Sequence, residues 1–178
     1  MLRKILSCGL IAGIVSGGFL SAVVLMSSHA MSSSGMAIGY ASMLIGLSAV
    51  FVAIRKRRDE DLGGVIRFLP AFALGLGVSF VAGVVYALAW EFAQAITGMD
   101  FAGDYTRQLI EQQKASGVSG EALARFVAEM DQFKQDYAKA SYRLPMTFME
   151  IFPVGVLVSL LSAALLRNPR FLPRRGRS

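Results

Sequence analysis

Four runs of apolar residues constrain the fold of this chain more than any other feature of its sequence. They cover residues 5–26, 36–54, 68–96 and 146–166 of a 178-residue chain. A helix rises about 1.5 Å per residue, so about 20 residues cross a hydrocarbon core about 30 Å thick. Only 17% of the residues are charged, against about a quarter in a soluble domain. The sequence therefore predicts an all-α, polytopic membrane protein, a bundle of four transmembrane helices.

Residues 98–144 are polar and predict a helical insertion outside the membrane, between the third and fourth spans. Apolar residues in its second half recur at three- and four-residue spacing, which indicates an amphipathic helix: Leu123, Phe126, Val127, Met130, Phe133 and Tyr137. The sequence SGVSG separates this helix from a shorter one around Tyr105, and Ser119 is placed to cap the second helix. We expect a helical hairpin that re-enters the membrane at Pro145, since proline suits a first helical turn.

The distribution of Lys and Arg predicts the orientation. Both ends of the chain and the connection at 55–67 together hold twelve basic and three acidic residues, whereas residues 98–144 hold six basic and seven acidic ones. Basic residues accumulate on the cytoplasmic side of membrane proteins. We therefore expect both termini in the cytoplasm and an extracytoplasmic hairpin.

The same topology accounts for the net charge of +6 without nucleic acid. The basic cytoplasmic tail at 167–178, RNPRFLPRRGRS, lacks the aromatic interleaving that base stacking uses. Clustered arginines attract anionic lipid, so we expect lipid at this tail and no nucleic-acid partner.

The first apolar run allows two interpretations. Arg3 and Lys4, the run itself and Ser28-His29-Ala30 resemble a secretory signal with a small-residue cleavage site. The run is longer than a usual signal core, however, and a second apolar run follows it. We expect a retained first helix.

Small residues recur every four positions in three of the runs, which places them on one face of each helix. Such faces let membrane helices approach closely. They are Gly9, Gly13 and Gly17, then Gly75, Ser79 and Gly83, and finally Gly155 and Ser159. We expect them to pack within the chain, and the alternative is a homo-oligomer or a membrane-protein partner bound through one of the faces.

Glu91 is an ionisable residue near the outer end of the third predicted helix, where the helix dipole disfavours an anion. Three side chains are candidate partners: Arg143, Glu150 and His29. An ion pair with Arg143 would give Glu91 a structural role. A Glu91–Glu150 pair with His29 nearby would instead bind a proton or a cation, because two close carboxylates cannot both ionise cheaply.

The sequence carries no catalytic motif. It has one cysteine and one histidine, and no Ser/His/Asp arrangement, nucleotide-binding loop or HExxH motif. We therefore expect no enzymatic activity, no cofactor and no catalytic or structural metal. The favoured function is a membrane protein that contacts a partner, or a copy of itself, through its hairpin and its tail; the alternative is a small proton- or cation-coupled transporter that uses Glu91 and Glu150.

The neighbouring sequence predicts where three aromatic side chains lie. Tyr86 and Trp90 are expected to anchor the third helix at the membrane interface, and Tyr40 is expected to pack in the core.

Two segments, GYASMLIGLSAVFVAIRKRRDEDLGGVIRF and VVYALAWEF, resemble the bacterial family called domain of unknown function 4199 (DUF4199). The residues that carry the likeness are Gly39-Tyr40, Ser42-Met43, Arg58-Asp59, Gly64, Ile66, Phe68, Tyr86 and Trp90. The resemblance covers nearly the whole chain. It implies a small four-helix protein of the bacterial inner membrane, and it implies no catalytic residues.

Overall fold

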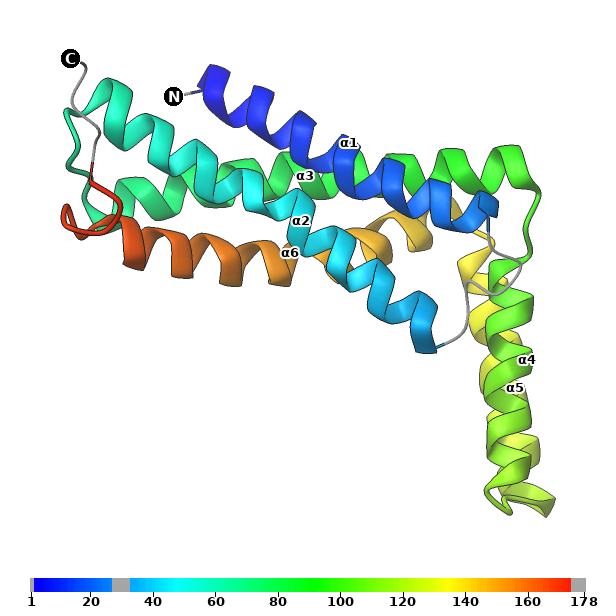
Figure 1. Ribbon diagram of the computed structural model, residues 1–178. Helices are drawn as coiled ribbons and strands as arrows, with labels where there is room; N and C mark the ends of the chain where they lie inside the picture. Colours follow the sequence, from blue (N-terminus) through cyan, green and yellow to red (C-terminus); the bar gives the residue numbers. More distant parts are fainter. Residues whose placement is uncertain (1, 27–32, 174–178) are drawn as a thin grey trace. The chain divides into compact units, whose positions relative to one another are not determined.

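The computed structural model describes residues 2–26 and 33–173, and within them it contains helices and no strand. The elements, labelled in Figure 1 apart from the short π-helix η1, are α1 (Leu2–Met26), α2 (Ser33–Lys56), η1 (Arg57–Asp61), α3 (Phe68–Thr97), α4 (Phe101–Ala115), α5 (Gly120–Tyr137) and α6 (Ala140–Leu166). The predicted all-α class is confirmed.

Among the described residues, three helices are long and apolar enough to cross a membrane: α1 over Leu2–Phe19, α3 and α6. This property follows from their length and composition, and it points to a membrane protein. The remaining predicted span falls in α2, whose described side chains begin at Tyr40. Ser28-His29-Ala30, where the cleavage site of a signal sequence was considered, lies outside the described residues.

The chain divides into two compact units. The main unit comprises Met1–Trp90 and Thr147–Ser178, and so holds α1, α2, most of α3 and most of α6. The α4–α5 unit comprises Glu91–Met146, and so holds the end of α3, both polar helices and the beginning of α6.

In the main unit, the glycine face of α1 lies directly on α3. Each glycine meets one residue of α3: Gly9 meets Val81, Gly13 meets Val85 and Gly17 meets Ala89. A Cβ atom added to Gly13 would lie 2.5 Å from the Cβ atom of Val85, too close for two non-bonded carbons. Because lipid removes most of the hydrophobic driving force between helices, contacts at such short range hold them together.

A different set of small residues joins α3 to α6. Cβ atoms added to Gly75 and Gly155 would lie 2.8 and 2.7 Å from the Cβ atoms of Ser159 and Ser79, respectively. The two serine hydroxyls are 3.1 Å apart, and both lie within hydrogen-bond distance of the Gly155 carbonyl, at 3.1 Å for Ser79 and 2.7 Å for Ser159. Both serines are buried. Close approach and buried hydrogen bonds therefore act at the same contact.

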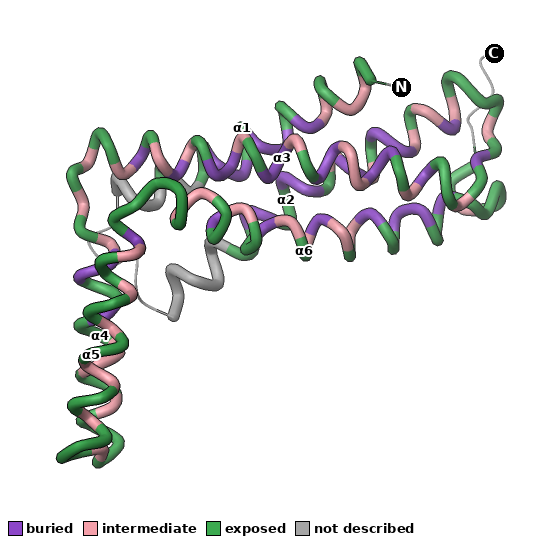
Figure 2. The backbone as a smooth tube through the Cα atoms, turned by 180° about the vertical axis from the view of Figure 1, so that it is seen from behind, coloured by how far each residue is buried: buried purple, intermediate pink, exposed green. Residues whose placement is uncertain are grey.

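The helix α2 completes the core of the main unit. A side chain on Gly46 would overlap the hydroxyl of Ser16 on α1, while Leu47, Val50 and Ile54 are fully buried. Figure 2 shows buried residues recurring along α1, α2, α3 and α6. The core thus has aliphatic side chains from α2 and small residues where the backbones come closest.

The apolar stripe of α5 is partly covered by α4 within the α4–α5 unit. Ring pairs connect the two helices, with centroid separations of 5.9 Å for Tyr105–Phe133 and 5.6 Å for Phe101–Tyr137. Aromatic pairs at such separations are favourable beyond their buried area. This packing explains the three- and four-residue spacing seen in the sequence.

Two expectations about helix ends are corrected. The helix α6 begins at Ala140, so Pro145 lies in its second turn and does not start it. The first turn is already closed by the bond from the Arg143 amide to the Lys139 carbonyl, at 3.1 Å. Ser119 occupies the N-cap position of α5, but its side chain makes no capping hydrogen bond.

The three aromatic expectations are wrong. Tyr86 and Trp90 are only 2% and 6% exposed, because they follow the buried Ala82 at four-residue spacing and so share its face. Tyr40 is exposed where core packing was expected. Hydropathy places residues along a helix, but the facing helices decide which side of it is covered.

We predict that Gly13→Ala destabilises the protein by about 1–3 kcal/mol, the usual cost of overpacking a close contact. Gly18→Ala is the matched control, because nothing lies within 4 Å of a Cβ atom at Gly18. Thermal unfolding of the two purified variants in detergent measures the difference. Equal stability of the two variants would contradict the α1–α3 contact.

Candidate functional site

Arg143 joins three helix ends of the α4–α5 unit. Its Nε and Nη2 atoms each donate to one carboxylate oxygen of Glu91 at 2.6 Å, and Nη1 donates to the Tyr137 carbonyl at 2.9 Å. Arg143 is in the first turn of α6, Glu91 is near the end of α3 and Tyr137 is the last residue of α5. The planar guanidinium matches a carboxylate in this two-bond geometry. One side chain therefore connects α3, α5 and α6.

The environment of this pair makes it a structural rather than a labile contact. The side chains of Arg143 and Glu91 are 17% and 23% exposed, so water competes weakly for them. The guanidinium also lies 5.7 Å from the centre of the Tyr137 ring, within the range of a cation–π contact. The guanidinium of Arg143 thereby balances the negative charge of Glu91.

The other two candidate partners of Glu91 are not brought to it in the α4–α5 unit. Glu150 belongs to the main unit, where it is exposed on α6. His29 lies outside the described residues. The Glu91–Glu150 site therefore stays a prediction. In the part of the chain that the structure describes, no cluster of three or more His, Cys, Asp or Glu residues could hold a metal ion.

A pocket of about 230 Å³ adjoins Arg143 in the same unit. Its lining includes Gln94, Asp100, Lys134 and Tyr137. Asp100 and Lys134 form an ion pair at 3.4 Å, and the buried Nε2 atom of Gln94 has no hydrogen-bond partner among the described residues. The pocket thus offers one amide donor between charges that already neutralise one another. This set can hold a water or another neutral acceptor, and it contains no nucleophile–base pair.

Asp100 is a helix cap that the sequence reasoning missed. Its side chain accepts a hydrogen bond from the Gly103 amide at 2.9 Å and so caps α4. This bond and the nearby Lys134 hold the pKa of Asp100 below its usual range. The available signal was an aspartate directly before the predicted helix, a residue strongly preferred at that position.

Arg58 is the second arginine with an unusual environment, and it lies in the main unit. Its side chain is fully buried in η1. Its Nε atom donates to Asp59 at 2.6 Å, and its Nη1 and Nη2 atoms donate to the carbonyls of Phe171 and Leu172 at 2.9 and 2.6 Å. By charge alone, Arg58 is one of the twelve basic residues at the chain ends and in the 55–67 connection. The only sequence signal for it was its place in the Arg58-Asp59 pair that carries the family resemblance.

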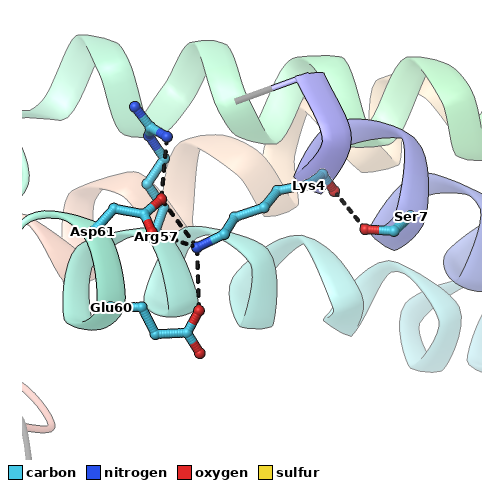
Figure 3. A network of polar contacts seen from close by, with 5 residues as sticks. All are labelled: Lys4, Ser7, Arg57, Glu60 and Asp61. Carbon is cyan, nitrogen blue, oxygen red and sulfur yellow. Dashed lines mark hydrogen bonds and ion pairs between the residues drawn. The ribbon is translucent and has the colours of Figure 1, made fainter.

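Glu60 and Asp61 of η1 form ion pairs with Lys4, near the start of α1 (Figure 3). Lys4 donates to Glu60 at 3.2 Å and to Asp61 at 3.0 Å, and Arg57 reaches Asp61 at 3.2 Å. The Lys4 ammonium holds the pKa of Asp61 below its usual range. In total, Asp59, Glu60 and Asp61 engage four basic side chains.

Several basic residues near this end keep their charge exposed. These residues are Arg3, Lys56, Arg67, Arg167 and Arg170. None of them forms an ion pair with another described residue. The end of the main unit where η1 meets the start of α1 and the segment after α6 therefore has an excess of positive charge, and we call it the basic end.

We predict that Arg143→Gln destabilises the protein by about 1–3 kcal/mol, because it removes charge-assisted bonds and leaves Glu91 without its partner. Arg125→Gln is the matched control. It breaks an Arg125–Glu121 pair whose side chains are 75% and 81% exposed, which should cost less than about 0.5 kcal/mol. Chemical unfolding in detergent gives both values, and a loss for Arg143→Gln no larger than the control would refute the joining role of Arg143.

We predict that Asp100→Asn removes a small pH dependence from the stability of the protein. A lowered folded pKa means that ionised Asp100 contributes stability above its ordinary pKa of 3.8, and that this contribution is lost as pH falls through the lowered value. Asparagine keeps the cap without the charge. Far-UV circular dichroism during acid titration should show wild type losing about a few tenths of a kcal/mol more than the variant below about pH 4. Identical titrations would contradict the lowered pKa of Asp100, because the charge would then add nothing to the stability.

The residues that carry the DUF4199 resemblance are mainly packing residues in this structure. Six of them are buried: Ser42, Met43, Arg58, Ile66, Tyr86 and Trp90. Gly64 has a φ of +101°, a backbone conformation that favours glycine. The resemblance therefore describes a core and a turn, and it points to no reactive group.

Comparison with known proteins gives one result. The family model described as "Protein of unknown function (DUF4199)" matches residues 7–168. No curated protein and no solved structure matches the chain significantly. Since the family match includes both structural units and nearly the whole chain, the protein belongs to the DUF4199 family.

Proposed function

We propose that this protein is a non-enzymatic protein of the bacterial inner membrane that spans the bilayer four times and acts through contacts at its two polar regions. Both termini would be cytoplasmic. The α4–α5 pair would form an extracytoplasmic hairpin and contact a partner protein, and the basic end would contact anionic lipid.

The observation that carries this proposal is the Arg143–Glu91 ion pair. A proton- or cation-coupled carrier needs a carboxylate that can bind and release its cargo. Both oxygens of Glu91 instead accept short bonds from one guanidinium, and charge-assisted pairs of this kind are among the strongest in proteins. Glu91 therefore supports a structural joint better than a transport site.

The surface of the α4–α5 unit supports a protein partner. Its ion pairs are exposed and of mixed sign, including Arg107–Asp104, Lys114–Glu111 and Arg125–Glu121. A surface of mixed charge has little attraction for an anionic bilayer but suits the polar rim of a protein interface. Tyr105 is exposed among these charges, and tyrosine is enriched at such interfaces.

The unpaired cations of the basic end support contact with anionic lipid. The three acids of η1 are already engaged, so they do not offset Arg67, Arg167 or Arg170. Each basic residue close to an anionic membrane surface contributes roughly 1 kcal/mol of attraction. The same excess supports a cytoplasmic location through the positive-inside rule.

We predict that the purified protein, reconstituted in liposomes, leaves an imposed pH gradient as stable as protein-free liposomes do, with or without a gradient of Na⁺, K⁺ or Mg²⁺. An entrapped pH-sensitive dye reports the gradient. The alternative function, transport through Glu91 and Glu150, predicts that the gradient decays with wild type and that Glu91→Gln abolishes this decay. That pair of results would replace our proposal with the transporter.

A further inference from the structure

The buried guanidinium of Arg58 depends on a segment that follows the last helix. Residues 168–173, which we call the tail segment, provide two of its acceptors, the carbonyls of Phe171 and Leu172. A buried charge is costly unless its donors are bonded. Asp59 engages only the Nε atom among the three bonds at this guanidinium, so the tail segment provides the acceptors for both terminal nitrogens. Arg58 and the tail segment therefore hold each other in place.

The tail segment has the geometry of a chain turned back onto the bundle. The Phe171 ring contacts the Phe51 ring of α2 edge-on, with centroids 6.5 Å apart. Phe51 lies more than one turn before the end of α2 at Lys56, so the chain reaches back toward the apolar part of that helix. Asn168 supports the turn, because its carbonyl and side-chain oxygens accept bonds from the Phe171 and Arg170 amides.

Backbone strain in the tail segment is an independent sign that it is held. Leu172 has a φ of +48°, and it is the one non-glycine residue with positive φ in the described part of the chain. A branched apolar residue adopts this conformation at a cost in free energy. Such strain persists only where other interactions fix the backbone, and the bond from Arg58 to the Leu172 carbonyl is one that does so.

We propose that Arg58 is the positioning residue of the basic tail, which it directs to the anionic lipid headgroups beside the basic end. Being buried, Arg58 touches no lipid itself. By fixing Phe171 and Leu172 it sets the point after which the arginine-rich sequence RRGRS, residues 174–178, begins. This inference rests on the lipid contact proposed above, and it adds the residue on which that contact depends.

Electrostatic range explains why the anchor point matters. At physiological ionic strength an exposed charge acts over only about 8–10 Å. Arginines that start from a fixed point beside the membrane spend more of their time within that distance than arginines on a free segment do. They also pay less ordering entropy when they bind, which is the general benefit of preorganisation.

The first readout is protection of the tail segment. Full-length protein is reconstituted in liposomes, and trypsin cleavage after Arg170 is followed by mass spectrometry. Wild type should be cut slowly, because a bound segment cannot adopt the extended form that a protease needs. Arg58→Gln should be cut about tenfold faster or more, as expected when the open form becomes more populated. Arg57→Gln is the matched control, because Arg57 contacts Asp61 and makes no bond to the tail segment.

The second readout is the position of the tail. A fluorophore is attached to a single cysteine at position 178 in a Cys8→Ala background, and its quenching by a headgroup-labelled lipid is measured. Liposomes contain phosphatidylcholine alone or phosphatidylcholine with phosphatidylglycerol. Wild type and Arg57→Gln should be quenched more in the anionic liposomes, and Arg58→Gln should lose that increase.

A second pair of variants keeps the test decisive if Arg58→Gln fails to fold. Leu172→Pro cannot adopt the positive φ of residue 172, so it should release the tail segment and reproduce both effects while Arg58 is retained. Leu172→Gly accepts positive φ freely and keeps the carbonyl, so it should behave like wild type.

Each contrary result has its own meaning. If wild type shows no extra quenching with phosphatidylglycerol, the proposed lipid contact is wrong, and the role given to Arg58 falls with it. If wild type shows the increase and both Arg58→Gln and Leu172→Pro retain it, the lipid contact stands and the positioning role of Arg58 is overturned. Unchanged trypsin protection in both variants also overturns it, because the tail segment would then not depend on Arg58.

Discussion

Close contact between helix backbones is the constraint on which the rest of this structure depends. In lipid, burying apolar surface gains little, so helices must approach closely enough for short-range contacts and buried hydrogen bonds. The helix α3 does this on two sides. It meets the glycines of α1 with Val81, Val85 and Ala89, and it meets α6 where Gly75 and Ser79 oppose Ser159 and Gly155. Larger side chains at these contacts would separate the helices on which both arginine sites are built.

Arg143 and Arg58 provide hydrogen-bond partners for carboxylates and backbone carbonyls near the ends of the apolar helices. Arg143 pairs with Glu91 and bonds the carbonyl at the C-terminal end of α5, one of the groups that a helix leaves without an internal partner. Arg58 pairs with Asp59 and bonds two carbonyls after α6. In both cases one rigid, five-donor side chain serves a carboxylate and the backbone together, with more donors and a more fixed geometry than the three-donor ammonium of lysine offers. This use of the charged groups supports the proposed contact role over the alternative of transport.

The sequence predicts the helices well because their signal is local. The run at 68–96 corresponds to α3, and the spacing of Phe126, Met130 and Phe133 corresponds to α5. The contacts that define the sites are not local. Arg58 meets residues more than a hundred positions away, and within RKRRDED only its place in the Arg58-Asp59 pair of the family resemblance distinguishes it from Arg57. Likewise, the apolar character of α3 gave no reason to bury Trp90, because its environment is set by the helices that face it.

Part of the site around Arg143 was nevertheless within reach of sequence reasoning. Glu91 and Arg143 are charged residues near the ends of apolar runs, so their need for a partner could be read from position alone. The competing partner, Glu150, has the same kind of position, and no local signal chooses between them. In the α4–α5 unit, Arg143 is the partner of Glu91, because it donates two hydrogen bonds to that carboxylate.

The most direct test of the close-contact account is a disulfide between positions 79 and 159. Ser79→Cys and Ser159→Cys are combined in a Cys8→Ala background, and native membranes are oxidised. Because the two hydroxyls are 3.1 Å apart within one chain, the account predicts efficient cross-linking that leaves the protein monomeric on a denaturing gel. No cross-link in folded protein would contradict the α3–α6 contact. A cross-linked dimer, formed also when the two single-cysteine chains are co-expressed, would show that these small-residue faces join two copies of the protein.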